Sequence, residues 1–164
     1  RRGGAGAECG QPHQYLELSL SHGPLPGGFD ERRWWAGLGW SYQYLGRFAE
    51  AEKAFAEGVG RRPDDQAALR GLGWALYQQQ QYLRAAEPFT RALELLAPED
   101  RDLIQETCRG RGWCLFYLKR CGDAWGDFER ALGHADPANR SLWEDLENGR
   151  RLCTAEVASQ KGTT

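Results

Sequence analysis

The side chains of this sequence that could act as metal ligands or nucleophiles are five cysteines and three histidines. Cys9, His13 and His22 are close enough in the sequence to share a metal ion, but they lie in a glycine-rich segment that offers no fourth ligand. Zinc sites in proteins use closed ligand sets, so we do not expect a metal site there. His134 has no partner at a spacing that suggests a nucleophile or a general base. The sequence therefore predicts neither catalytic residues nor a cofactor.

The other cysteines fall in segments with helical periodicity and lack the two-residue spacing of metal-binding or redox pairs. Free cysteine behaves as a small apolar side chain, so we expect buried thiols at all four positions. These positions are Cys108, Cys114, Cys121 and Cys153.

Length and composition indicate one domain, because 164 residues with 41% apolar side chains can bury a single sizeable core. The net charge of -2 gives no support for a nucleic-acid partner. There is no run of about 18 apolar residues, so we expect no membrane insertion. We expect a soluble protein and favour the cytoplasm slightly, although no segment addresses the chain to a compartment. The chain contains no methionine, which indicates a piece of something longer.

The sequence indicates a binding site more strongly than a catalytic or metal site, because three tryptophans recur in the same local sequence. The string Gly-x-Gly-Trp ends at Trp40, Trp74 and Trp113, which are 34 and then 39 residues apart. Other landmarks recur in step: Phe48, Tyr82 and Cys121; Ala51, Ala85 and Ala124; Phe55, Phe89 and Phe128. A period of this length indicates an array of repeated structural units.

Each unit reads as two helices. After Asp30, a plausible N-cap, apolar residues recur at the spacing of one helical face until Gly46. A second amphipathic helix is predicted over residues 47–59, before the glycine and proline break at 60–63. Two short helices joined by a tight turn therefore form one unit.

The unit recurs at about 64–96 and 99–132. Five extra residues of the third unit lie between Leu96 and Cys108, so its first helix should be longer by more than a turn. Asn139 can cap a final helix, which would cover the end of the array. The apolar stripe of that helix is Leu142, Leu146, Cys153 and Val157.

The ends of the chain are expected to lie outside the domain. Residues 1–28 begin glycine-rich and read as a flexible N-terminal arm or linker. Within them, residues 14–20 could form a short helix or an extended arm. The repeat domain with its capping helix is predicted over 29–158, and residues 159–164 read as a tail.

The first unit has Trp-x2-Leu-Gly-x2-Tyr at residues 35–42, Ala-x3-Phe at 51–55 and then Pro63. This pattern is that of the tetratricopeptide repeat, and the chain resembles that family over about residues 32–138 plus the final helix. The resemblance implies an all-α, right-handed α-solenoid of three helix pairs with a C-terminal capping helix.

The landmark residues have a packing role in such a unit. The glycines that should let the two helices of each pair approach closely are Gly39, Gly73 and Gly112. The third unit departs from the pattern, because Cys108 replaces a tryptophan, Arg111 a leucine, and Cys121 a large aromatic residue. We therefore expect the third unit to pack less well.

In this family the first helices line the concave surface and usually bind an extended or helical peptide. At about 100° per residue, the three tryptophans of the Gly-x-Gly-Trp strings point away from the core stripe, so the resemblance places them in that groove. The predicted groove residues are Trp40, Gln43, Tyr44, Arg70, Trp74, Tyr77, Gln78, Arg109, Trp113, Phe116 and Tyr117. The two arginines suggest an acidic or carboxylate-bearing ligand.

Two simpler interpretations remain open for these residues. Each tryptophan could merely pack against a neighbouring unit, and Arg70 and Arg109 could lie on a solvated face. The chaperone-type members of the family hold a terminal carboxylate with an Asn at the position taken here by the three tryptophans. Its absence argues against that class of ligand.

The sequence thus predicts a non-catalytic adaptor or scaffold that binds another protein through a peptide or helical segment. One alternative is a scaffold that binds a carbohydrate polymer in polysaccharide export or secretion, because aromatic rings stack on sugars. Another is a structural spacer or self-association module of a larger chain, with the N-terminal arm docking into a neighbour.

Overall fold

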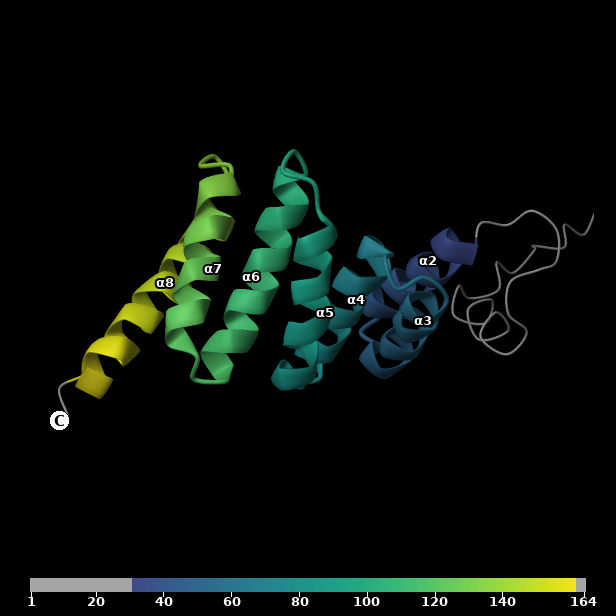
Figure 1. Ribbon diagram of the computed structural model, residues 1–164, viewed down its shortest axis with the longest axis horizontal. Helices are drawn as coiled ribbons and strands as arrows, with labels where there is room; N and C mark the ends of the chain where they lie inside the picture. Colours follow the sequence, from purple (N-terminus) through teal and green to yellow (C-terminus); the bar gives the residue numbers. More distant parts are fainter. Residues whose placement is uncertain (1–30, 162–164) are drawn as a thin grey trace, which may run out of the picture.

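The computed structural model describes residues 31–161, and this range folds into helices joined by short turns, with no strand (Figure 1). The helices are α2 (Glu31–Tyr44), α3 (Phe48–Arg61), α4 (Gln66–Gln78), α5 (Tyr82–Leu95), α6 (Arg101–Tyr117), α7 (Cys121–His134) and α8 (Arg140–Lys161). The expected all-α solenoid is confirmed, with three pairs and a final helix. The predicted arm at 1–28 lies outside the described residues, and α8 continues past the predicted end at 158.

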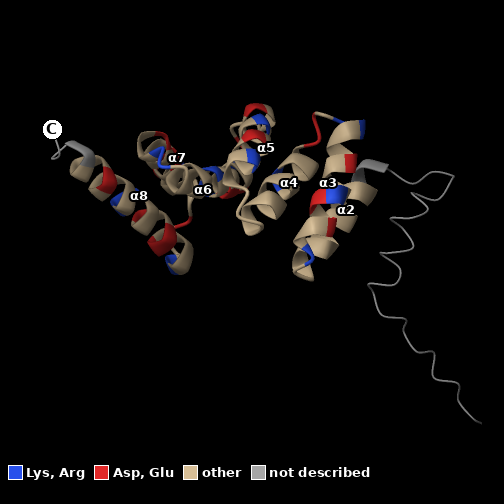
Figure 2. Ribbon diagram, turned by 90° about the horizontal axis from the view of Figure 1, so that it is seen from below, with Lys and Arg blue, Asp and Glu red and all other residues tan. Residues whose placement is uncertain are grey.

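The pairs are stacked side by side along the long axis of the molecule. Figure 2 shows α5 and α7 along one side of the stack and α4, α6 and α8 along the other. The second helix of each pair also packs on the first helix of the next, as α3 does on α4 and α5 on α6. No described helix is long and apolar enough to cross a membrane.

The turn inside each pair has one repeated geometry. The chain adopts a positive φ at Gly46, at Gln80 and at Lys119, which are the same position in successive units. The next residue then donates its N–H to a carbonyl five residues back, as in the bonds from Arg47 to Tyr42 and from Gln81 to Leu76, both 2.9 Å. This is the bond that closes a helix in the Schellman motif. Glycine at the first of these turns was therefore a correct sign of a helix end.

The core of each pair is a phenylalanine held between two glycines. Phe55 is fully buried, and a Cβ added to Gly39 of the same pair would lie 2.5 Å from its ring. A Cβ added to Gly71 of the next pair would lie only 2.2 Å from the same ring. The pattern repeats with Phe89 between Gly73 and Gly110, and with Phe128 between Gly112 and Gly149. The close approach predicted within pairs is confirmed, and a second approach between pairs accompanies it.

The third unit contains the expected extra length. Helix α6 has 17 residues and α4 has 13, so the difference is slightly more than one turn. The departure at Arg111 is balanced by a buried partner, because its Nη2 donates to Asp127 Oδ1 at 2.6 Å and its Nε to Oδ2 at 2.7 Å. Asp127 takes the place that Pro88 has in the second unit. An ion pair thus stands where the second unit has two apolar residues, Leu72 and Pro88.

The four predicted buried thiols are confirmed as free and buried. Burial is the main cause that raises the pKa of Cys108 to about 11 and that of Cys114 to about 12. These thiols are therefore protonated at neutral pH, and the thiolate is the reactive form.

The final helix is the expected cover. Asn139 Oδ1 accepts a hydrogen bond from the Leu142 N–H at 3.3 Å, which is the predicted N-cap. Leu146 and Cys153 are fully buried against α7, and Val157 packs on the same cluster. The apolar stripe of α8 therefore covers the last pair.

Candidate functional site

The three recurring tryptophans occupy the same place in α2, α4 and α6, and all are half-buried. Each packs edge-on against the core phenylalanine of its own pair. The ring centroids are 5.3 Å apart for Trp40 and Phe55, 5.4 Å for Trp74 and Phe89, and 5.1 Å for Trp113 and Phe128. The prediction that these indoles leave the core face is therefore wrong in part. Each indole starts from a position outside the core stripe, but its ring reaches back to the phenylalanine of its own pair.

Arg70 and Trp74 share one carboxylate of the next unit. Arg70 Nη1 donates to Glu106 Oε2 at 2.6 Å, and Trp74 Nε1 donates to Glu106 Oε1 at 2.9 Å. The side chain of Arg70 is only 12% exposed. The positive charge expected to meet a ligand is thus already neutralised within the chain.

The same arrangement recurs one unit later. Arg109 Nε donates to Asp145 Oδ2 at 2.7 Å, and Trp113 Nε1 donates to the same oxygen at 3.2 Å. The guanidinium of Arg109 also lies 5.9 Å from the centre of the Trp74 ring, within the range of a cation–π contact. The expectation of a basic surface free for an acidic ligand is therefore wrong, because α6 and α8 each supply an acid.

Sequence reasoning missed these two acids. Both lie 36 residues after the arginine and 32 after the tryptophan that they bind. A search for acids at a constant offset from the Arg-x3-Trp positions would have found them.

The first unit lacks this arrangement. Ala36 stands where the later units have arginine, and Ala67 stands where α6 and α8 have an acid. Among the described residues, the Trp40 indole N–H has no acceptor. One turn further along α2, the amide oxygen of Gln43 is buried without a described hydrogen-bond partner. This end of the row therefore contains two polar groups without a described partner, of which the Gln43 oxygen is buried.

A cluster of tyrosines joins the second and third units. Tyr82 and Tyr117 stack with centroids 4.5 Å apart and an interplanar angle of 18°. Tyr77 lies 5.6 Å from Tyr82 and 5.5 Å from Trp74, and Trp113 lies 6.2 Å from Tyr117. Burial, followed by the neighbouring Tyr117 and Tyr82, raises the pKa of Tyr77, so its phenol is neutral at physiological pH. The aromatic contacts are thus continuous from Trp74 to Trp113.

Tyr82 belongs to this cluster although it comes from a second helix and was predicted only as a packing landmark. Among the predicted groove residues, Phe116 is half-buried and packs on Trp113 at 5.6 Å. Tyr117 is 48% exposed, and Tyr44 is 92% exposed at the end of α2. Gln78 is exposed at the end of α4. The predicted aromatic residues of units two and three therefore meet, whereas Tyr44 and Gln78, which end their helices as Tyr117 does, are exposed.

Stacked helix pairs with a repeated small-to-large core place this chain among the α-solenoid repeat proteins. A tetratricopeptide-repeat family model matches residues 37–100. The matched segment therefore consists of tetratricopeptide repeats, and the third helix pair continues the same pairing beyond it. No curated protein matches the chain at a significant level.

Solved structures share the fold at low sequence identity. The first tetratricopeptide domain of human RPAP3 is 20% identical with a TM-score of 0.65, and the match covers 81% of this chain and 97% of that one. The first such domain of Spaghetti bound to an HSP90 peptide is 20% identical with a TM-score of 0.66, covering 77% and 93%. A type III secretion complex from Aeromonas hydrophila contains a chain 18% identical with a TM-score of 0.63, covering 90% and 98%.

Proposed function

We propose that this chain is a non-catalytic adaptor that binds a peptide segment of another protein along the side formed by α2, α4 and α6. The observation that carries the proposal is the continuous row of aromatic rings from Trp74 through Tyr77 and Tyr117 to Trp113, with Tyr117 about half exposed. Aromatic side chains are enriched at the anchor positions of protein interfaces. They offer a large contact area and lose little conformational freedom.

The internal ion pairs limit the chemistry of the ligand. Arg70 and Arg109 are occupied by Glu106 and Asp145, so an acidic peptide would have to displace those carboxylates. We therefore propose a peptide that is recognised through apolar or aromatic side chains, with its main chain accepting a hydrogen bond from the Trp40 indole N–H. The Spaghetti domain bound to an HSP90 peptide supports peptide binding by this fold. The tryptophans at the family's Asn position argue for a different peptide here.

The first test uses peptides selected from a random 12-residue display library against the unmodified chain. Tyr77→Ala and Tyr117→Ala should each weaken binding of a selected peptide by about 2 kcal/mol, or roughly 30-fold, because each removes part of an aromatic anchor. Isothermal titration calorimetry measures the affinity, and circular dichroism checks that helix content is unchanged.

Leu83→Ala is the matched control, because Leu83 is 74% exposed on a second helix. Its affinity should equal that of the unmodified chain. Equal affinity in all three variants would contradict the proposed groove. Binding of neutral oligosaccharides by a chain for which the library yields no peptide would favour a carbohydrate ligand instead.

The second test removes the carboxylates that bind Arg70 and Arg109. Replacing both acids, as Glu106→Gln plus Asp145→Asn, leaves Arg70 and Arg109 without their partners. In 20 mM salt, an acidic variant of the selected peptide should then bind the double variant about tenfold more tightly than it binds the unmodified chain. This gain in affinity should fall as salt is added. Fluorescence anisotropy over a salt series measures both effects.

The control is the pair Glu57→Gln plus Glu94→Gln, which removes the same charge from exposed positions on α3 and α5. An equal gain in this control would show that net charge alone is responsible. The effect must be confined to the first pair of substitutions if the two acids shield the arginines.

A further inference from the structure

The first described helix, α2, carries a surface that in later units contacts the preceding unit, but no described residue contacts it here. Phe55 packs on Gly71 of the following unit, and the later units repeat this contact. Gly37 is the first glycine of the same series, yet it is exposed, and no described atom lies within 4 Å of a Cβ placed on it. One face of α2 therefore has the form of an inter-unit contact without a described partner.

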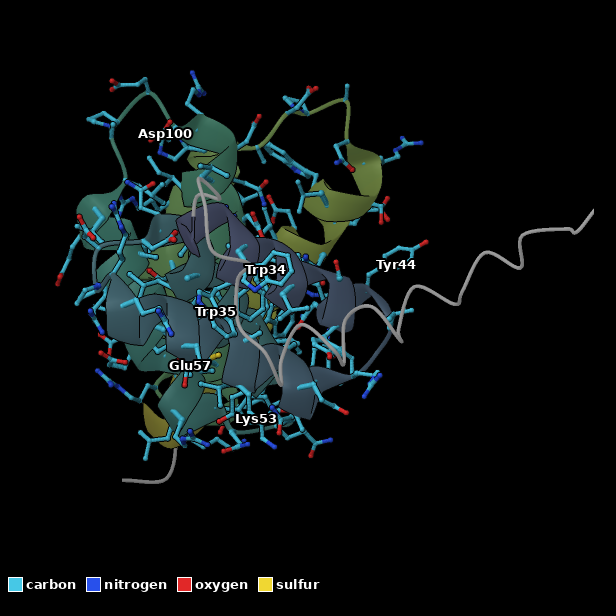
Figure 3. All side chains as sticks on the ribbon, turned by 90° about the vertical axis from the view of Figure 1, so that its right-hand side faces the viewer. Trp34, Trp35, Tyr44, Lys53, Glu57 and Asp100 are labelled. Carbon is cyan, nitrogen blue, oxygen red and sulfur yellow. The ribbon has the colours of Figure 1, made fainter. Side chains whose placement is uncertain are left out.

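Ser41 extends this face by one turn. Its equivalents Ala75 and Cys114 are fully buried in the core clusters of the units that precede them. Ser41 itself is exposed and donates its hydroxyl to the Gly37 carbonyl at 2.9 Å. We refer to Gly37 and Ser41 as the Gly37 face. Figure 3 looks onto this end of the molecule, where Trp34 also lies.

Trp34 restricts what can cover the Gly37 face. Its equivalents in the later units are Ala68 and Thr107, both fully buried. At the first of these, α3 comes so close that a Cβ on Gly58 would lie 3.3 Å from the Ala68 Cβ. An indole in place of that small side chain obstructs a full helix pair in the same register. A shorter segment can still reach Gly37 and Ser41.

The spacing of the repeats indicates which segment this is. Each core phenylalanine precedes the glycine that it contacts in the next unit by 16 or 21 residues, as in Phe55 with Gly71 and Phe89 with Gly110. The same two spacings counted back from Gly37 fall on Ser21 and Leu16, and the segment between these positions also contains Leu18 and Leu20.

The distance from each core phenylalanine to the start of the next helix indicates which leucine is its equivalent. The core phenylalanines lie 11 or 12 residues before the next helix begins, as Phe55 does before Gln66. Leu20 lies 11 residues before Glu31, where α2 begins. In the established contact, Ala51 is four residues before Phe55, and it joins the same cluster as Ala75.

We propose that residues 14–20 of this chain dock on the Gly37 face as a half unit, with Leu20 on Gly37 and Leu16 beside Ser41. The leucines would then take the places of the phenylalanine and the alanine of the established contacts. The break at residues 23–28 would serve as the connection that proline-containing turns provide between later units. The N-terminal segment thus covers the first end of the solenoid, as α8 covers the last.

The test is disulfide cross-linking in the full chain carrying Cys9→Ser, since the other four cysteines are buried. Leu16→Cys combined with Ser41→Cys should form an intramolecular disulfide under mild copper–phenanthroline oxidation. Mass spectrometry of the monomer should show the loss of two hydrogens, and peptide mapping should join residues 16 and 41.

Leu16→Cys combined with Tyr44→Cys is the matched control. Tyr44 lies on the same helix at nearly the same tether length but is 92% exposed at its end. Docking predicts cross-linking at least tenfold faster with Ser41→Cys than with Tyr44→Cys. Equal rates would overturn the proposal, because a free tether reaches both sites. A cross-link that forms mainly between two chains would also overturn it and assign the face to a second copy.

Discussion

Gly71→Ala should destabilise the protein by about 3 kcal/mol or more, although it adds one methyl group. The new Cβ would lie 2.2 Å from two atoms of the Phe55 ring. The ring has little room to retreat, because it is fully buried and lies so close to Gly39 that a Cβ placed there would be 2.5 Å away. Overpacking of a close contact costs about 1–3 kcal/mol and sometimes more. Urea denaturation followed by circular dichroism should show the loss as a lower midpoint.

Gly126→Ala provides the control for helix propensity. Gly126 lies inside α7, and no described atom is within 4 Å of a Cβ placed there. Alanine should therefore stabilise this helix by up to about 1 kcal/mol. If both substitutions raise the midpoint, Gly71 is not a close-approach position, and the contact between units is looser than described.

Arg111→Leu should cost about 3–5 kcal/mol of stability, although leucine is the residue found at this position in the first two units. Asp127 is 4% exposed, and two nitrogens of Arg111 donate to its two oxygens. Removing the arginine leaves a buried carboxylate without its counter-charge. The same hydrogen bond with Asp127 is the main cause that raises the pKa of Arg111. Thermal and urea denaturation measure the loss.

The double variant Arg111→Leu plus Asp127→Ala separates the ion pair from simple packing. Replacing both members of a buried ion pair by apolar side chains is often neutral or stabilising. The double variant should therefore recover at least half of the stability lost in Arg111→Leu. A double variant as unstable as the single one would show that the arginine contributes mainly through the volume of its side chain.

The helices themselves could be predicted from the sequence because their determinants are local. Asp65 accepts from the N–H groups of Ala67 and Ala68, and Gly46 adopts the positive φ that ends α2. Such residues act within one turn of the chain, and the apolar spacing of 3.6 residues marks the buried face of each helix. The period of 34 and 39 residues then fixes the pairing of helices.

The candidate site could be predicted only in part. The positions of the three tryptophans on the first helices follow from the repeat, whereas the acids that bind Trp74 and Trp113 emerge only when two units are compared at equal offsets. Glu106 lies 36 residues from Arg70, and no local pattern distinguishes it from other acids of α6. The tyrosine cluster likewise depends on Tyr82 turning toward the first helix of the next unit.

By itself, then, the sequence determined the number of helix pairs, their ends, the capping helix and the glycines that allow close approach within each pair. The tertiary structure decided what lies between pairs: which glycine meets Phe55 from the next unit, which acid neutralises Arg109, and which rings remain exposed. The physical reason is the distance along the chain over which the deciding interactions act. Helix formation and pairing depend on residues a few positions apart, whereas contacts between units depend on the angle at which whole pairs stack, and that angle is set by all the side chains between them.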